Sequence, residues 1–423
     1  MATFDKANLW RNPDFVKLWS AHTISATGSK VTFLALPLTA ALVLQATPAQ
    51  MGYLAVAGSL PGLLFGLLVG VWVDRRRRRG LLVLADVGRG LLLLAIPLAA
   101  WLGWLQMSWL YGIIFLTGTL TLIFGAAYHA YLPSLVPREQ LLDANSNLEI
   151  SRSAAEITGP TLAGWLIQVA TAPVAILVDA LSFLLSGWLV SAIRQPEAPP
   201  LRHAEDGHFG QEISAGLRLL YQNRTLWAIT IATAIISFFN AAIEAIYLLY
   251  MTHDLALSAW WIGIIFGAGS VGFLVGALLP VYLVRRLGLG PTMILGLLLL
   301  AIADLIFPLV SGPQPLVIAL LTLSQVSFGF GLTFYNVSKE SLQQSITPAH
   351  MLGRMSATLD FTVAALIPLG ALLGGLLGEW LGLRTTLFLA AGGELLAVVW
   401  LLFSPVRRSR TGYEQPRLTA HQE

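Results

Sequence analysis

The chain has 423 residues and a formal net charge of +3, and 56% of its residues are hydrophobic while only 11% are charged. An ordinary soluble domain carries about 25% charged residues, so in water this composition would expose excessive apolar surface. The absence of cysteine excludes disulfides and thiolate metal sites.

Residues 1–19 mix acidic and basic side chains and lack a cleavable signal pattern, so we expect a short cytoplasmic lead-in. Twelve mostly apolar stretches follow, each long enough to cross about 30 Å of hydrocarbon as a helix. They are approximately 15–43, 50–73, 80–103, 108–134, 147–170, 172–193, 224–251, 259–284, 289–311, 314–342, 353–378 and 384–404. The prediction is an all-α integral membrane protein with twelve transmembrane helices.

The second half of the chain repeats features of the first at a fixed offset of 211 residues. Gly52 recurs as Gly263, and Gly164 recurs as Gly375. Further pairs are Gly58 and Gly269, Pro137 and Pro348, Leu141 and Leu352, and Gly159 and Gly370. Parallel repeats build many secondary transporters around a site between their halves. We therefore expect two six-helix bundles, residues 1–193 and 224–404, related by a pseudo-two-fold axis.

Residues 194–223 form a polar stretch between the predicted bundles. Proline and glycine in its first part are typical of a flexible linker. Apolar residues then recur at helical spacing from Phe209 to Leu220, which predicts a short amphipathic helix at the membrane surface. The segment either joins two moving bundles or is a simple tether. Residues 405–423 are predicted to form a cytoplasmic tail.

The basic residues predict the orientation. Of the 25 Lys and Arg, all but Lys30 and Arg384 fall in the termini, in alternate loops, or close to the helix ends that those loops join. Because basic residues accumulate on the cytoplasmic side, both termini are predicted to be cytoplasmic in a bacterial-type plasma membrane. The net positive charge then reflects topology, and no nucleic-acid partner is expected.

The stretch from Gly70 to Arg79 reads G-V-W-V-D-R-R-R-R-R and resembles the loop signature G-x-x-x-D-R-x-G-R-R of the major facilitator superfamily. It departs from that pattern at Arg77, where glycine is usual. Other blocks resemble the branch that contains enterobactin and macrolide exporters, among them Asn12-Pro13-Asp14-Phe15, Asp86-Val-Gly-Arg89, Tyr131-Leu-Pro-Ser-Leu-Val136, Gly159-Pro160 and Asp179-Ala-Leu-Ser-Phe183. The second half is degenerate, because its corresponding loop has no acidic residue matching Asp74.

Asp74 is the first candidate for a gating residue. A carboxylate at a cytoplasmic helix end accepts hydrogen bonds from a helix start or from an arginine. The resemblance implies a latch with the start of helix 11, near Met351 to Arg354, and the alternative is a structural loop anchor. The arginines hold the topology and contact anionic lipid. The gating set is Gly70, Asp74, Arg75, Arg78, Arg79 and Arg354.

Small residues spaced by about four positions predict close helix contacts in lipid. The resemblance implies that helices 2 and 11, and helices 5 and 8, face each other across the two halves, while the alternative is packing within one bundle. The residues in this set are Gly62, Gly66, Gly159, Pro160, Gly164, Gly370 and Gly374.

Ionisable residues inside membrane spans are costly and indicate function, although any one of them is alternatively a satisfied structural group. The resemblance places helices 1, 4, 7 and 10 around a central cavity, which favours Lys30 and Glu244. Lys30 is either the counter-charge of Glu244 or a binder of an anionic substrate. Asp304 and Glu394 fall on supporting helices. Asp86 and Arg89, and likewise Glu149 and Arg152, lie one helical turn apart and can each form a local i, i+3 pair. The coupling or substrate candidates are Lys30, Glu244, Glu156, Asp179, Asn240 and Asn336.

Together these features predict a monomeric secondary transporter that exports a small amphipathic organic substrate (a drug, macrolide or siderophore) in exchange for protons. No cofactor is expected, since the proton gradient supplies the energy. No phosphate-binding loop and no nucleophile–base set is present, which argues against an ATPase or an enzyme. The alternatives are a lysophospholipid or other lipid transporter, and a non-transporting sensor or scaffold.

Overall fold

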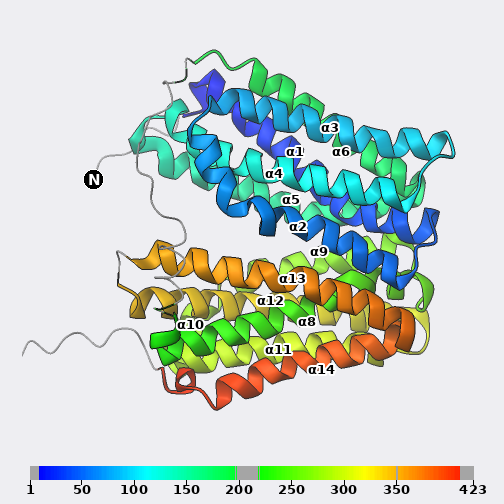
Figure 1. Cartoon of the computed structure of the whole chain (residues 1–423), viewed down its shortest axis with the longest axis vertical. Helices are drawn as coiled ribbons and strands as arrows, with labels where there is room; N and C mark the ends of the chain where they lie inside the picture. Colours follow the sequence, from blue (N-terminus) through cyan, green and yellow to red (C-terminus); the bar gives the residue numbers. More distant parts are fainter. Residues whose placement is uncertain (1–8, 196, 198–217, 219, 349–350, 410–423) are drawn as a thin grey trace, which may run out of the picture. The chain divides into compact units, whose positions relative to one another are not determined.

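The computed structural model describes residues 9–195, 197, 218, 220–348 and 351–409, and every long regular element within them is a helix (Figure 1). The first half contains α1 (Pro13–Leu38), α2 (Pro48–Asp74), α3 (Arg78–Trp101), α4 (Met107–Leu135), α5 (Leu141–Val169) and α6 (Ala172–Ser191). The second half contains α8 (Arg224–His253), α9 (Ala259–Gly276), α10 (Pro280–Leu287), α11 (Leu289–Leu309), α12 (Gln314–Ile346), α13 (Leu352–Leu381) and α14 (Leu383–Leu402). The amphipathic helix predicted within 194–223 falls almost entirely outside the described residues.

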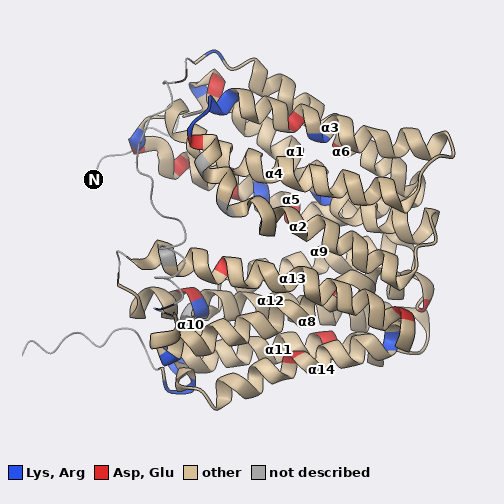
Figure 2. Ribbon diagram, viewed as in Figure 1, with Lys and Arg blue, Asp and Glu red and all other residues tan. Residues whose placement is uncertain are grey.

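The chain divides into two compact units. Unit 1 comprises Met1–Glu205, Ala241–Ala268 and Ile367–Thr386, and unit 2 comprises Asp206–Asn240, Gly269–Leu366 and Leu387–Glu423. The boundaries fall inside α8, α9, α13 and α14, so these four helices contribute residues to both units. In each unit the Lys and Arg residues lie mainly near one end of the helices (Figure 2).

Local sequence explains where the first helices begin. The Asn12 side chain accepts hydrogen bonds from the backbone N–H groups of Asp14 (3.0 Å) and Phe15 (3.2 Å), which caps α1. Thr47 and Gln50 form a reciprocal capping box at the start of α2. Both helices have proline at their first position, where its missing N–H does not matter.

Ten helices in the described part of the chain are long and apolar enough to cross a membrane. A further pair within α2, Pro48–Gly66 and Leu68–Asp74, is bent by 58° and brings the count to eleven if it forms one span. Helix α5 is long enough, but its charged residues Glu149, Arg152 and Glu156 lower its hydropathy. The span predicted over 259–284 is too long, because α9 ends at Gly276 and α10 begins only at Pro280.

The helix bounds reproduce the sequence repeat. Helix α6 runs from Ala172 to Ser191, and α14 runs from Leu383 to Leu402, which is the same length at the same offset of 211 residues. Helices α3 and α11 begin at the same offset, at Arg78 and Leu289, although α11 ends earlier. The buried core of unit 1 includes Leu82 of α3 and Val190 of α6, and the core of unit 2 includes Leu300 of α11 and Leu401 of α14.

An ion pair is buried between α3 and α6 in unit 1. The Arg89 guanidinium lies 2.5 Å from the Asp86 carboxylate, and the two side chains are 5% and 0% exposed. Ser186 of α6 donates a hydrogen bond to Asp86 at 2.7 Å. Arg89 also lies over the rings of Phe124 and Phe183, with its guanidinium carbon 4.5 and 4.1 Å from the ring centroids. The i, i+3 pair expected from the sequence is therefore confirmed, and its partners compensate the burial of both charges.

This burial predicts the effect of removing one charge. Arg89→Leu leaves Asp86 buried without a counter-charge and should destabilise the protein by about 3–5 kcal/mol. The double variant Asp86→Leu/Arg89→Leu reproduces the equivalent positions of the repeat, Leu297 and Leu300, which are 0% and 1% exposed. It should be much less destabilised. Thermal unfolding of the purified proteins compares the two, and equal destabilisation would contradict a role for charge pairing.

Candidate functional site

A row of alternating charges lies along α1 and α5 in unit 1. The Lys30 ammonium is 3.4 Å from the Glu156 carboxylate, which also accepts a 2.6 Å hydrogen bond from Arg152. Arg152 in turn binds Glu149 through two hydrogen bonds of 2.5 and 2.9 Å, which confirms the second expected i, i+3 pair. The four side chains are between 34% and 59% exposed. They line an accessible face of the helix pair.

Gly159 allows α1 and α5 to approach at this point. A Cβ added to Gly159 would overlap the Cβ of Lys30. The Lys30 stem therefore lies directly on the backbone of α5, three residues after Glu156. This contact places Gly159 at an interface between two helices of the first half.

Aromatic side chains of unit 1 lie next to this charged row. Phe33 follows Lys30 by three residues on α1, and its ring centroid is 6.5 Å from that of Phe266 on α9. Phe266 also contacts Tyr247 of α8 at 5.3 Å between centroids. Charged and aromatic groups side by side suit an amphipathic organic molecule.

Glu244 lies one helical turn before Tyr247 on α8, and its side chain is exposed. Within the described residues it forms no ion pair. The expected pairing of Lys30 with Glu244 is therefore wrong for this structure, because Lys30 pairs with Glu156. The sequence alone does not show which of the two glutamates, Glu156 or Glu244, lies next to Lys30.

Asp179 is buried between α6 and α1, with 1% of its surface exposed. Ser182 donates a hydrogen bond to its Oδ1 at 3.0 Å, whereas Oδ2 has no hydrogen-bond donor among the described residues. A Cβ on Gly28 of α1 would overlap Asp179 Oδ1 and Ser182 Oγ. Asp179 is thus enclosed by tight packing and does not line an open surface.

Unit 2 contains a cavity of its own, with a volume of about 430 Å³. It lies between α8, α12 and α13, and it includes the predicted substrate residue Asn336. The other predicted asparagine, Asn240, is partly exposed on α8 and does not line it. The lining mixes polar and apolar side chains, and its charged members are Lys339, Glu340 and Asp360.

The predicted gating residues lie at the end of α2 and the start of α3. Asp74 is exposed and forms no hydrogen bond or ion pair within the described residues. The carboxylate that caps α3 is that of Glu197, which accepts hydrogen bonds from the backbone N–H groups of Arg78 (2.6 Å) and Arg79 (3.2 Å). Sequence reasoning missed Glu197, because it lies 119 residues away from Arg78 in an irregular segment.

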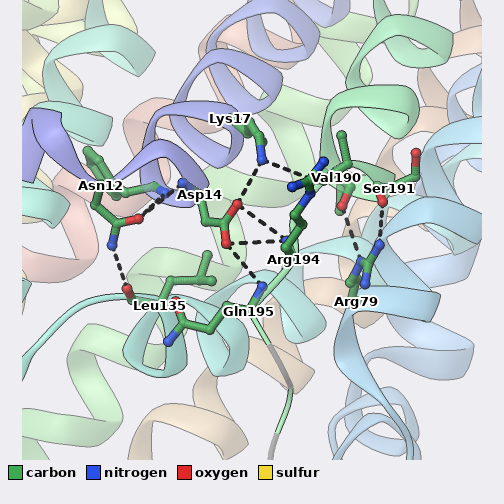
Figure 3. Close-up of polar contacts among 11 residues, drawn as sticks. Asn12, Asp14, Lys17, Arg79, Leu135, Val190, Ser191, Arg194 and Gln195 are labelled. Carbon is green, nitrogen blue, oxygen red and sulfur yellow. Dashed lines mark hydrogen bonds and ion pairs between the residues drawn. The ribbon is translucent and has the colours of Figure 1, made fainter.

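Arg79 ties α3 to the end of α6. Its guanidinium donates to the carbonyl oxygen of Val190 at 3.4 Å and to that of Ser191 (Figure 3). Gly70 and Arg75 are exposed, and the side chain of Arg354 lies outside what the structure describes. The gating role of these residues stays a prediction, whereas Arg79 has a clear anchoring contact.

A second carboxylate, Asp14, joins the ends of α1 and α6 (Figure 3). It accepts hydrogen bonds from the Lys17 ammonium at 2.8 Å and from the backbone N–H groups of Arg194 and Gln195 at 3.2 and 3.0 Å. These contacts hold the segment after α6 against the start of α1.

Two pairs of glycines bring helices into contact at one end of unit 1. We call it the distal end, because it is the end of α2 and α5 that lies away from Asp74 and Arg138. A Cβ added to Gly52 would lie 2.9 Å from the Cα of Gly375, which brings α2 against α13. A Cβ added to Gly164 would lie 2.9 Å from the Cα of Gly263, which brings α5 against α9. The offset of 211 residues maps one contact onto the other. The helix pairs expected from the resemblance are thus in contact here.

The other predicted packing residues are arranged less uniformly. Nothing in the described residues lies within 4 Å of a Cβ built at Gly62, Gly66 or Gly70 of α2. Gly374 of α13 packs directly on the backbone of Ala242. The remaining two, Pro160 and Gly370, are buried.

Comparison with known proteins gives a consistent family assignment. The model of the Major Facilitator Superfamily matches residues 18–366 and 231–421. Macrolide efflux protein A of Streptococcus pyogenes is 23% identical over 412 residues, covering 96% of this chain and 99% of that protein. The multidrug efflux pump Tap of Mycobacterium tuberculosis is 27% identical over 392 residues, covering 90% of each chain.

Solved structures share the fold. The nucleoside transporter NupG superposes with a TM-score of 0.74 at 13% identity, over 92% of this chain and 98% of that one. A bacterial homologue of the iron transporter ferroportin, in an inward-facing state, gives a TM-score of 0.72 at 18% identity, with coverage of 92% and 98%.

The paired glycine contacts predict matched effects of a single methyl group. Gly52→Ala and Gly263→Ala each force backbones apart and should each destabilise the protein by about 1–3 kcal/mol. Gly112→Ala on α4 is the control, because nothing lies within 4 Å of its Cβ position and alanine favours a helix. Thermal unfolding of the three variants measures this, and a neutral result at both contact sites would show that the distal contacts carry no stability.

Proposed function

This chain belongs to the major facilitator superfamily, and we propose that it is a proton-coupled exporter of lipophilic organic compounds that works by alternating access. Its similarity to macrolide and multidrug efflux proteins extends over at least 90% of both chains. A similarity of that extent supports transport as the activity of the whole chain rather than of one part, and a transporter of this superfamily is not an enzyme.

The observation that carries the proposal is the charged row of Lys30, Glu156 and Arg152 beside the aromatic cluster of Phe33 and Phe266. Charges within membrane spans are costly unless they serve a pathway or a site. An aromatic wall next to fixed charges recognises a large molecule with an apolar body and a few polar groups. Drugs, macrolides and siderophores are of this kind.

We place the arginine-rich helix ends in the cytoplasm, following the positive-inside rule. Counting α5 and the bent α2 as spans gives twelve crossings, with both termini cytoplasmic. The charges of Glu149, Arg152 and Glu156 in α5 balance once Lys30 of α1 is included, which lowers the cost of placing that helix in the membrane. The protein would act as a monomer in a bacterial plasma membrane.

Glu244 is the best candidate for the proton carrier. Glu156 already has two cationic partners, Lys30 and Arg152, and is held in the charged row. Glu244 has no such counter-charge within the described residues, so it exchanges a proton more readily when its surroundings change. A carboxyl group that binds a proton, and releases it when the substrate binds, couples export to the proton gradient. No other cofactor is required.

Lipid transport is a second candidate, because an amphipathic lysophospholipid meets the same requirement for apolar and charged contacts. Accumulation of a panel of macrolides, siderophores and lysolipids in cells with and without the protein separates the two. Lower accumulation of a drug or macrolide supports the proposal. Unchanged accumulation of every compound would favour a non-transporting sensor or scaffold.

The exposed Asp74 carboxylate gives a prediction about gating. It contributes no contact to the fold within the described residues, so Asp74→Asn should leave expression and thermal unfolding unchanged. If Asp74 acts as a gate, export by the reconstituted variant should fall by about tenfold or more, equivalent to about 1.4 kcal/mol. Asp254→Asn, at an exposed loop position, is the matched control. Wild-type rates in the Asp74 variant would exclude the gating role.

A second prediction addresses coupling. Glu244→Gln keeps the shape and polarity of the side chain but binds no exchangeable proton, so substrate binding should persist while transport driven by a pH gradient is lost. Drug-stimulated proton movement in proteoliposomes is the measurement, with the exposed Glu139→Gln as control. If the glutamine variant still moves protons with substrate, Glu244 is structural, and Glu156 or Asp179 becomes the next candidate.

A further inference from the structure

Asp304 of α11 and Glu394 of α14 form a pair of buried acids in unit 2. Asp304 is 4% exposed, and Glu394 is completely buried. The two carboxyl groups lie close enough to interact with each other. Oδ2 of Asp304 and both oxygens of Glu394 have no other hydrogen-bond partner among the described residues. Two carboxylates in such a position would repel each other without compensation.

The groups around the pair offer no positive charge. Gly393, next to Glu394, packs on the ring of Phe239 from α8. Ala303, next to Asp304, accepts a 2.7 Å hydrogen bond on its carbonyl oxygen from Ser324 of α12. No Lys, Arg or His within the described residues forms an ion pair with either acid. Among the described residues, the titratable group that acts on each carboxyl is the other one.

The sequence repeat supplies an internal comparison. In the first half, the equivalent helices α3 and α6 also bury an acid, Asp86, but Arg89 neutralises it at 2.5 Å. The position equivalent to Arg89 in the second half is Leu300, which is 1% exposed. Glu394 occupies the position equivalent to Phe183, whose ring covers Arg89 in the first half. The second half therefore keeps buried acid between these two helices and lacks the arginine.

We infer that Asp304 and Glu394 form a proton-binding site of the second half, in which a bound proton takes the place of the missing arginine. A proton shared between the two acids removes one negative charge, and the protonated carboxyl donates a hydrogen bond to the other carboxylate. Two like-charged carboxylates within one buried site share protons for this reason. The site is separate from Glu244 and from the charged row on α5.

This inference concerns the folded protein and does not depend on proton-driven export. If export uses another energy source, the proposed function fails, but Asp304 and Glu394 still hold the proton. If export is proton-driven and both acids are ionised, the proposed function holds and only the present inference fails. The two proposals therefore fail independently.

Infrared spectroscopy of the purified protein at neutral pH tests the site, because protonated carboxyl groups absorb separately from carboxylates and shift on deuteration. The wild-type minus Asp304→Asn/Glu394→Gln difference spectrum should show a protonated carboxyl band. Asp254→Asn, which alters an exposed acid, should give no such difference. If the double variant fails to fold, Glu394→Gln alone provides the comparison. No difference in the protonated region would overturn the inference.

Thermal unfolding provides a second readout. If the folded protein holds a proton that the unfolded chain releases, the free energy of unfolding decreases as the pH rises. From about pH 6 to about pH 9 the melting temperature of the wild type should therefore fall more steeply than that of Asp304→Asn/Glu394→Gln. Parallel slopes would contradict the inference, and a smaller slope in the variant supports it.

Discussion

The energetic cost of charge inside an apolar helix bundle governs the arrangement of this protein. An unpaired ion in such surroundings costs several kcal/mol, so each buried charge needs a partner. The first half pairs two of its acids with bases: Arg89 neutralises the buried Asp86, while Lys30 and Arg152 bind the partly exposed Glu156. Asp179, which is also buried, forms no ion pair within the described residues. The second half buries Asp304 and Glu394 together without a base among the described residues. Helices α6 and α14 have matching bounds, but the two halves differ in how they neutralise charge at these helices.

The same constraint separates anchoring groups from groups that can change state. Asp86 and Arg89 are buried and enclosed by Ser186 and two aromatic rings. Glu244 and Asp74 are exposed and lack such contacts within the described residues. A transport cycle requires contacts that break and form again, and the distal glycine contacts of α2 with α13 and of α5 with α9 are suited to this because they involve backbone surfaces without interlocking side chains.

Local patterns could be predicted from the sequence, and long-range contacts could not. The pairs Asp86–Arg89 and Glu149–Arg152 are confirmed because three residues along a helix fix their proximity. The glycine contacts followed from the resemblance and the repeat. Glu197 at the start of α3 was missed, and Lys30 was assigned the wrong partner, because both depend on how distant segments pack. Asp304 and Glu394 were set aside as residues of supporting helices, since nothing in the sequence indicates that their side chains meet.

We propose above all that this transporter uses a proton gradient to export an amphipathic organic compound. Reconstituted wild-type protein with an imposed pH gradient tests it most directly, by measuring accumulation of a macrolide against its own concentration gradient. The predicted result is uphill accumulation that requires the pH gradient and collapses when a protonophore is added. Accumulation that is unaffected by the protonophore, or equilibration without any uphill phase, would contradict proton-coupled export.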